Sequence, residues 1–174
     1  MKVTVISFSF KRGIPGDPTG NGNAPVAEGD QVGRMSEANE PRSGRMSPRG
    51  FVFDCRAMPN PFWDETLRGY TGRDKPVADF FARFPETIEP FLEATETLVR
   101  QSIEQYKRDG RDHLQVAFGC TGGQHRSVYF AERMAERLAD IDGVDIEITH
   151  KAKQYWTASH AKENRCIIFQ EELR

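Results

Sequence analysis

Hydrophobic residues cluster in four short runs with the composition of buried β-strands. The runs are VTVISF (residues 3–8), FVFDC (51–55), HLQVAFG (113–119) and VDIEITH (144–150). β-Branched and aromatic residues dominate the first two, and such residues favour the pleated, buried surface of a sheet. The pattern therefore predicts four strands.

Between these runs, hydrophobic residues recur every three or four positions, which predicts amphipathic helices. Asp74 can cap a short helix that has Pro76 in its first turn. The apolar face of this short helix is Val77, Phe80, Phe81 and Phe84. A longer helix follows and ends at Gly110, and one of its sides is formed by Ile88, Phe91, Leu92, Thr95, Leu98, Val99, Ile103 and Tyr106. A third helix is expected from Ser127 to Asp140, with an inner stripe of Ala131, Met134, Ala135 and Leu138.

Strands that alternate with helices predict a single α/β layered domain, residues 1–174, with a mostly parallel sheet flanked by helices. The stretch from about residue 16 to residue 50 is rich in Gly, Pro, Asn and Ser and has almost no large apolar residues. We therefore expect one long disordered insert there, with the strands before and after it in one sheet. These first two strands could be parallel or form a hairpin. In the tail, RCIIFQEEL (165–173) is compatible with a strand or a short helix.

Composition narrows the class of protein. The net charge of −2 and the isoelectric point of about 6.1 exclude a chain that attracts nucleic acid through its overall charge. The three cysteines, Cys55, Cys120 and Cys166, are odd in number and widely spaced, which predicts neither a disulfide framework nor a zinc site and favours a reducing compartment. No apolar stretch approaches the roughly 20 residues of a membrane helix. We expect a soluble cytoplasmic protein with no metal, cofactor or membrane partner.

The junction between the third strand and the third helix, FGCTGGQHRSV (118–128), has an unusual composition. Gly122 and Gly123 allow main-chain amides to approach a ligand, and a helix N-terminus favours an anion by about 0.3–1 kcal/mol when exposed. Arg126 can bind phosphate or carboxylate through two N–H groups. The junction therefore predicts a phosphate-binding loop whose candidate residues are Cys120, Thr121, Gly122, Gly123, His125, Arg126 and Ser127.

The same loop permits a catalytic interpretation. Cys120, Arg126 and Ser127 have the C-x5-R-S spacing of the nucleophile loop of cysteine phosphatases, in which a thiolate attacks phosphorus while amides and the arginine bind phosphate. Gly119 stands where that motif commonly has histidine, and no aspartate is singled out as a general acid. A phosphatase or phosphotransferase with Cys120 as nucleophile is thus an alternative to a non-catalytic site, in which Cys120 closes a strand.

Further charged groups follow the first two strands. Lys11 and Arg12 come after the first, and Asp54 and Arg56 stand at the end of the second. In a parallel sheet these groups meet the loop at one edge, where ligands of such sheets bind. Cations would bind the phosphate of a phosphorylated sugar, and the carboxylate its hydroxyls or an amine. Asn60, Arg68 and Lys75 are further candidates for the rim of this site. In a hairpin, Lys11 would lie at the wrong end.

Aromatic residues outside the predicted elements have competing interpretations. Phe62 and Trp63 are expected in the core rather than as a stacking surface. A basic and aromatic patch that could bind RNA consists of Lys151, Lys153, Lys162, Arg165, Tyr155 and Trp156. Scattered surface lysines and core aromatics account for the same residues more simply.

Four blocks of the sequence resemble one protein family. GCTGGQHRSVYFAERMAERL (119–138) is similar to the signature of the RapZ C-terminal domain, of the RNase adapter and P-loop protein family. FSFKRGIP (8–15), FVFDCRAMPNPFWDETLR (51–68) and TGRDKPVADFF (71–81) match it in the family's order. The resemblance covers most of the chain from Phe8 to Leu138.

The resemblance implies an α/β fold likened to a sugar-phosphate kinase subdomain, which senses an amino-sugar phosphate and binds a small regulatory RNA. Full-length relatives carry a Walker A motif in their N-terminal half, and no such string occurs here, so any nucleotide would have to use the 119–127 loop. The insert at 16–50 replaces a short connection of the relatives. The C-terminal end, with Glu171 and Glu172, is acidic where the family's RNA-binding end is basic.

Residues and resemblance together predict a non-catalytic regulatory domain. We expect it to bind a phosphorylated metabolite, such as an amino-sugar phosphate, and to act through a protein or RNA partner. The cysteine-dependent phosphatase and an RNA-binding adapter remain the alternatives, and the oligomeric state stays open.

Overall fold

A four-stranded, all-parallel sheet forms the centre of the molecule. The computed structural model describes residues 1–15 and 50–157. The strands are β1 (Lys2–Ser9), β2 (Gly50–Asp54), β3 (His113–Cys120) and β4 (Asp145–His150), in the order β2-β3-β1-β4. β3 pairs with β2 and β1, and β1 pairs with β4, each time in parallel. The prediction of an α/β layered fold with a parallel sheet is confirmed, and the hairpin for the first two strands is excluded.

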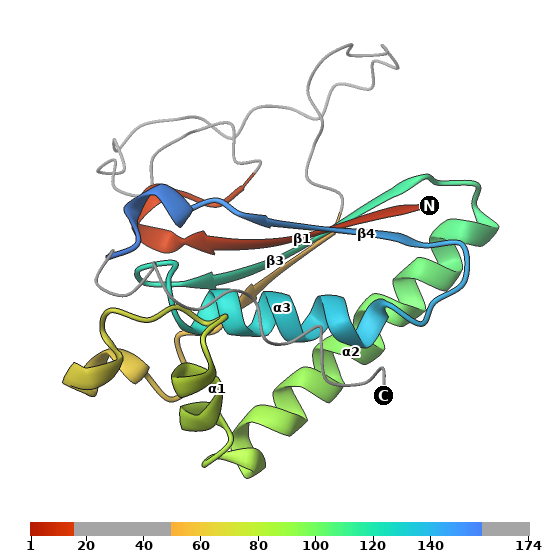
Figure 1. Cartoon of the computed structure of the whole chain (residues 1–174). Coiled ribbons are helices and arrows are strands. Elements are labelled where there is room, and N and C mark those ends of the chain that lie inside the picture. The colour runs from red at the N-terminus through yellow and green to blue at the C-terminus, as the bar shows by residue number, and fades with distance from the viewer. Residues whose placement is uncertain (16–49, 158–174) are drawn as a thin grey trace, which may run out of the picture.

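Three helices cover one face of this sheet (Figure 1). They are α1 (Lys75–Phe81), α2 (Pro85–Arg108) and α3 (Arg126–Leu138). α3 is the helix that connects β3 to β4. Side chains alternate along each strand, so that Val3, Val5 and Phe118 face the helices and pack with Leu92 and Phe130 in the main core. Stacked and edge-on rings of Phe81, Phe91, Phe118, Tyr129 and Phe130 fill much of this layer. Burial of these rings is what holds the helices to the sheet.

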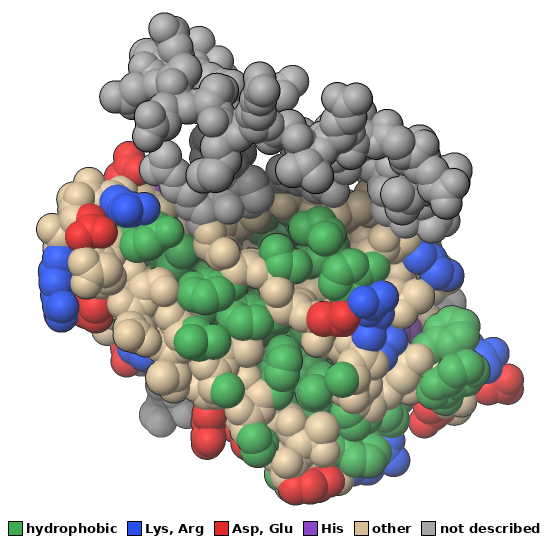
Figure 2. Space-filling view, turned by 180° about the vertical axis from the view of Figure 1, so that it is seen from behind, with side chains coloured by type: hydrophobic (Ala, Val, Ile, Leu, Met, Phe, Trp, Pro, Cys, Tyr) green, Lys and Arg blue, Asp and Glu red, His purple; other side chains and the backbone are tan. Residues whose placement is uncertain are grey.

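The opposite face of the sheet has a smaller apolar cluster. Ile6, Phe8 and Ala117 are buried there, and Phe10 packs against them. Seen from behind the view of Figure 1, the surface has a broad area of hydrophobic side chains (Figure 2). Large hydrophobic residues with more than two-fifths of their surface exposed are Ile14, Val52, Phe62, Trp63, Leu98 and Tyr155. The expectation that Phe62 and Trp63 lie in the core is therefore wrong, because their short 3₁₀ turn, Pro61–Trp63, buries only Pro61.

The boundary between the first two helices differs from the predicted one. The apolar spacing extended the short helix to Phe84, whereas α1 ends at Phe81 and Phe84 is the residue that precedes α2. Pro85 is the physical reason, because a residue before proline avoids the helical conformation, and Phe84 has φ of −129°. Phe84 still packs partly against the main core.

The parallel arrangement brings the predicted site residues to one edge. The carboxyl ends of β1, β2 and β3 lie together, so Lys11, Asp54 and the loop after Cys120 share that edge. The expectations for the insert at 16–50 and for the tail segment 165–173 fall outside the described residues. In the described part of the chain, no helix is both long and apolar enough to span a membrane.

Candidate functional site

The loop between β3 and α3 presents its first residues to solvent. Thr121 and Gly122 are exposed, whereas Gly123 is buried against Ser9 and Ala152. Gly123 has φ of +72°, and a Cβ there would lie 2.6 Å from the Ala152 Cβ, so only glycine fits. The Ser9 hydroxyl donates a hydrogen bond to the Thr121 carbonyl at 2.7 Å. The end of β1 thus holds the loop through the Thr121 carbonyl, with Thr121 and Gly122 exposed.

The Cys120 sulfur lies beneath this exposed segment. Its Sγ atom accepts a hydrogen bond from the Gly123 amide at 3.2 Å and donates one to the Ser127 hydroxyl at 3.2 Å. Cys120 and Ser127 are both buried. The C-x5-R-S spacing therefore places the hydroxyl and one loop amide on the sulfur, which is the environment a nucleophilic thiolate would need.

Three consecutive side chains of the loop bind main-chain carbonyls of the segment 56–70. The Gln124 amide donates to the Arg68 carbonyl at 3.0 Å and to the Tyr70 carbonyl at 2.8 Å. His125 Nε2 donates to the Leu67 carbonyl at 3.1 Å. Arg126 Nη1 donates to the Arg56 carbonyl at 2.9 Å. We call these four hydrogen bonds the carbonyl clamp; they fix the segment 56–70 against the N-terminus of α3.

Within the clamp, His125 and Arg126 are buried and hold main-chain carbonyls. Both are more than nine-tenths buried. Burial lowers the pKa of His125, with the positive charge of Arg126 acting in the same direction against the hydrogen bond to Leu67. A neutral His125 uses its one N–H on Leu67. A role for His125 and Arg126 as ligand-binding groups stays a prediction, and both already position the surrounding main chain.

A charged pair stands on the same edge at the end of β2. Arg56 binds the Asp54 carboxylate through two nitrogens, with Nη2 to Oδ2 at 2.6 Å, and its guanidinium lies 4.2 Å from the centre of the Phe10 ring. The hydrogen bond from Arg56 lowers the pKa of Asp54, and the charge of Arg126 adds to this effect. Asp54 is therefore ionised at neutral pH, and Lys11 is exposed at the end of β1.

Asn60 has a local structural role. Its Oδ1 atom accepts a hydrogen bond from the Phe62 amide at 3.4 Å and caps the turn Pro61–Trp63. The segment therefore carries the exposed Trp63 on a turn that the carbonyl clamp holds in place.

A buried polar chain that the sequence did not reveal lies beside the loop. The Ser7 hydroxyl donates to His150 Nδ1 at 2.8 Å, and His150 Nε2 donates to Glu132 Oε1 at 2.9 Å. Burial would raise the pKa of Glu132, but the hydrogen bond from His150 and the charge of Arg73 outweigh it and lower that pKa. The chain joins β1, β4 and α3, and no spacing signal in the sequence links residues so far apart.

The proposed basic and aromatic patch is only partly described, because Lys162 and Arg165 lie outside the described residues. The Trp156 indole donates a hydrogen bond to the Gly123 carbonyl at 2.9 Å, so this ring is attached to the loop between β3 and α3. The Arg12 guanidinium lies 3.2 Å from the centre of the Tyr155 ring. Lys151 and Lys153 are exposed. The aromatic rings here thus have partners within the protein.

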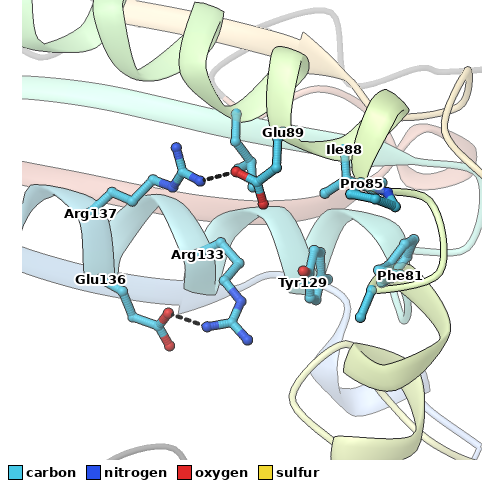
Figure 3. A pocket seen from close by; sticks show the side chains of 10 residues that line it. Phe81, Pro85, Ile88, Glu89, Tyr129, Arg133, Glu136 and Arg137 are labelled. Carbon is cyan, nitrogen blue, oxygen red and sulfur yellow. Dashed lines mark hydrogen bonds and ion pairs between the residues drawn. The ribbon is translucent and has the colours of Figure 1, made fainter.

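A pocket of about 410 Å³ lies on the helical side, between α2 and α3 (Figure 3). Its apolar walls include Phe81, Ile88 and Tyr129, and its rim carries two ion pairs, Arg133–Glu136 and Arg137–Glu89. All four rim charges are neutralised by one another. Within residues 1–15 and 50–157, no group of three or more His, Cys, Asp or Glu side chains is placed to hold a metal ion.

The chain is similar in sequence to known proteins of one family. The family model described as the RapZ C-terminal domain matches residues 42–154. A nucleotide-binding protein of Bordetella avium is 37% identical over 140 residues, which are 80% of this chain and 37% of the relative. Nucleotide-binding proteins of Parafrankia sp. and Halorhodospira halophila are 37% and 39% identical over 87% and 80% of this chain. The chain spans about two-fifths of the length of these curated relatives.

The close approach of Gly72 to the first turn of α3 predicts that Gly72→Ala destabilises the protein. A Cβ at Gly72 would lie 2.2 Å from the Tyr129 nitrogen and 2.3 Å from the His125 oxygen, and main-chain atoms cannot yield as side chains do. We expect a loss of about 1–3 kcal/mol or more in the free energy of unfolding, measured by urea denaturation. Gly122→Ala is the matched control, since its Cβ meets nothing within 4 Å, and should change stability by less than about 1 kcal/mol.

The burial of His125 predicts a pH dependence of stability. Its pKa is lower in the folded protein than the ordinary value of 6.5, so the unfolded state binds the proton more readily. The free energy of unfolding should fall as the pH drops below 6.5, by at most about 1.4 kcal/mol per pH unit from this group. Urea denaturation at several pH values would measure it. A His125→Gln variant with the same slope as the wild type would contradict this account.

Proposed function

Because the chain belongs to the RapZ C-terminal domain family, we propose that it is a non-catalytic regulatory domain that binds a phosphorylated small molecule at the loop 119–127. The observation that carries the proposal is the exposure of Thr121 and Gly122 in the loop that leads from β3 to the N-terminus of α3 at Arg126. Unpaired amides at a helix N-terminus favour an anion, and a small exposed segment lets a phosphate reach them.

The charges around this segment support the same ligand class. Lys11 is exposed on the same edge, and Arg56 with its partner Asp54 stands at the end of the neighbouring strand. Lys11 and Arg56 would bind phosphate oxygens, and the ionised Asp54 would accept hydrogen bonds from hydroxyls or an amine of the ligand. A phosphorylated amino sugar combines these groups and is the first compound class to test.

The carbonyl clamp gives His125 and Arg126 a positioning part in this proposal. Arg126 holds the turn that carries Arg56, and its charge lies close enough to Asp54 to lower the pKa of that carboxyl. The binding groups would thus be preorganised, so that less conformational entropy is lost when the ligand binds.

The names of the relatives bear on two further points, a nucleotide as ligand and the partner of the domain. Curated relatives are named nucleotide-binding proteins, and a nucleotide would also offer a phosphate to this loop. A regulatory domain must pass its ligand state to a partner, which we propose to be a protein or an RNA. The segment 56–70 and Trp156 both contact the loop, so they are the surfaces through which a change at the loop would be read.

The ligand can be tested by thermal denaturation with a panel of hexosamine phosphates, nucleotides, inorganic phosphate and unphosphorylated hexosamines. We expect a hexosamine phosphate to raise Tm and its unphosphorylated form to leave Tm unchanged. Lys11→Ala should weaken binding about tenfold, the usual cost of a lost hydrogen bond between charged groups. Lys2→Ala is the matched control at the opposite end of the same strand and should bind normally. No shift with any phosphorylated compound would refute the proposal.

A second candidate function is favoured by the hydrogen bonds on Cys120. The Gly123 amide and the Ser127 hydroxyl, both at 3.2 Å from Sγ, are suited to stabilise a thiolate. The alternative is a cysteine-dependent phosphatase or phosphotransferase in which Cys120 attacks phosphorus. Against it, Cys120 is only 3% exposed and Arg126 donates to a main-chain carbonyl.

Turnover of an aryl phosphate distinguishes this alternative from the regulatory domain. An enzyme of this type would release phenolate at a rate that vanishes in Cys120→Ser, while phosphate binding survives. We expect equal background rates in the wild type and in the variant, because the sulfur is covered and its arginine is engaged elsewhere.

A further inference from the structure

Cys55 and Cys120 are neighbours on adjacent parallel strands. Asp54 pairs with Gly119 at the end of the β2–β3 ladder, and the Cys55 amide donates to the Gly119 carbonyl at 2.8 Å. This bond continues the parallel ladder by one residue and places Cys55 beside Cys120. Both are free thiols, and both are buried.

The two side chains point to the same side of the sheet. Phe53 and Phe118 are partners in the ladder, and both pack in the core under the helices. Since side chains alternate along a strand, the residues two positions further on, Cys55 and Cys120, face the same side. Neighbouring strands are about 4.7–4.9 Å apart, and disulfides join Cα atoms about 4.4–6.8 Å apart. The spacing of the two strands therefore lies within the range of Cα separations that a disulfide joins.

We propose that Cys55 and Cys120 form a reversible disulfide that switches the phosphate-binding loop off under oxidising conditions. The oxidant is a hydroperoxide such as hydrogen peroxide. The Cys120 thiolate attacks the peroxide oxygen, the O–O bond breaks, and sulfenic acid and water form. The Cys55 sulfur then attacks the Cys120 sulfur and displaces a second water. In total, two thiols lose two electrons and two protons to one peroxide.

The surroundings of the two sulfurs indicate which thiol reacts with the peroxide and which one then forms the disulfide. Cys120 lies directly under the exposed Thr121–Gly122 segment, and the Gly123 amide and Ser127 hydroxyl can both donate to its thiolate. Burial raises the pKa of the Cys55 thiol, and the nearby Cys120 raises it further. Cys120 is thus the thiol that a peroxide meets first, and Cys55 is the resolving thiol.

A disulfide would change the loop because Cys120 Sγ is part of its hydrogen-bond framework. Turning the sulfur toward Cys55 removes the acceptor of the Gly123 amide and the partner of the Ser127 hydroxyl. Gly123 has no room to follow, since its left-handed conformation is packed against Ser9 and Ala152. The Thr121–Gly122 main chain would then lose its exposed arrangement. This consequence for binding rests on the proposed function of the loop, whereas the disulfide itself does not.

Peptide mapping of the full chain tests the disulfide directly. Trypsin places Cys55 in peptide 50–56, Cys120 in peptide 112–126 and Cys166 in peptide 166–174. After treatment with hydrogen peroxide and alkylation of free thiols, mass spectrometry should show peptides 50–56 and 112–126 linked, and dithiothreitol should separate them. Cys166→Ser should retain this link, and Cys55→Ala should lose it. Absence of the link in wild type, at doses that oxidise Cys120 further, would overturn the inference.

Ligand titration of the same samples tests the regulatory consequence. Binding of a hexosamine 6-phosphate should weaken at least tenfold in the disulfide form and recover after reduction, while the Cys55→Ala variant without peroxide should keep the affinity of the reduced wild type. Unchanged affinity in a fully linked sample would overturn the switch. If the reduced protein binds none of the phosphates, the proposed function fails together with the switch, and the peptide mapping alone decides on the disulfide.

Discussion

The carbonyl clamp is the interaction on which the rest of the site depends. Gln124, His125 and Arg126 each donate to main-chain carbonyls of the segment 56–70. Buried carbonyls need donors, and a histidine and an arginine placed beside a helix N-terminus supply them without leaving unsatisfied polar groups. Because the donors are consecutive, the loop and the segment are fixed to each other as one unit. The clamp explains why the loop needs these side chains whether or not a ligand is bound.

The clamp also divides the loop into two parts with different functions. His125 and Arg126 are buried and Gln124 is half-buried, while Thr121 and Gly122 are exposed and the Cys120 sulfur accepts a hydrogen bond from the Gly123 amide. The internal part carries most of the chemically distinctive side chains, and the exposed part consists mainly of main chain. The proposed anion site would therefore rely on amides and on nearby charges such as Lys11 and Arg56. The same geometry places one sulfur where a change in its oxidation state would reach the exposed amides.

Several expectations from the sequence failed or stayed open for reasons that can be named. Phe84 has the spacing of a helix face, but the proline after it ends the helix. Phe62 and Trp63 are large and apolar, yet their turn projects from the molecule, and apolarity alone does not tell a core position from an exposed one. The assignment of His125 and Arg126 to a phosphate site stays a prediction, and the carbonyls of Leu67 and Arg56, to which they donate, carry no sequence signal.

The sequence by itself determined the four strands, the three helices, their alternation and the position of the glycine-containing loop at 119–127 between β3 and α3. These follow from periodicity and from glycine positions, which act over a few neighbouring residues. Only the tertiary structure decided that β1 and β2 are both parallel to β3, that Ser7 meets His150 and Glu132, and that Cys55 lies beside Cys120. Those contacts join residues far apart in the chain, and strand order and register, which bring them together, depend on the packing of the whole core.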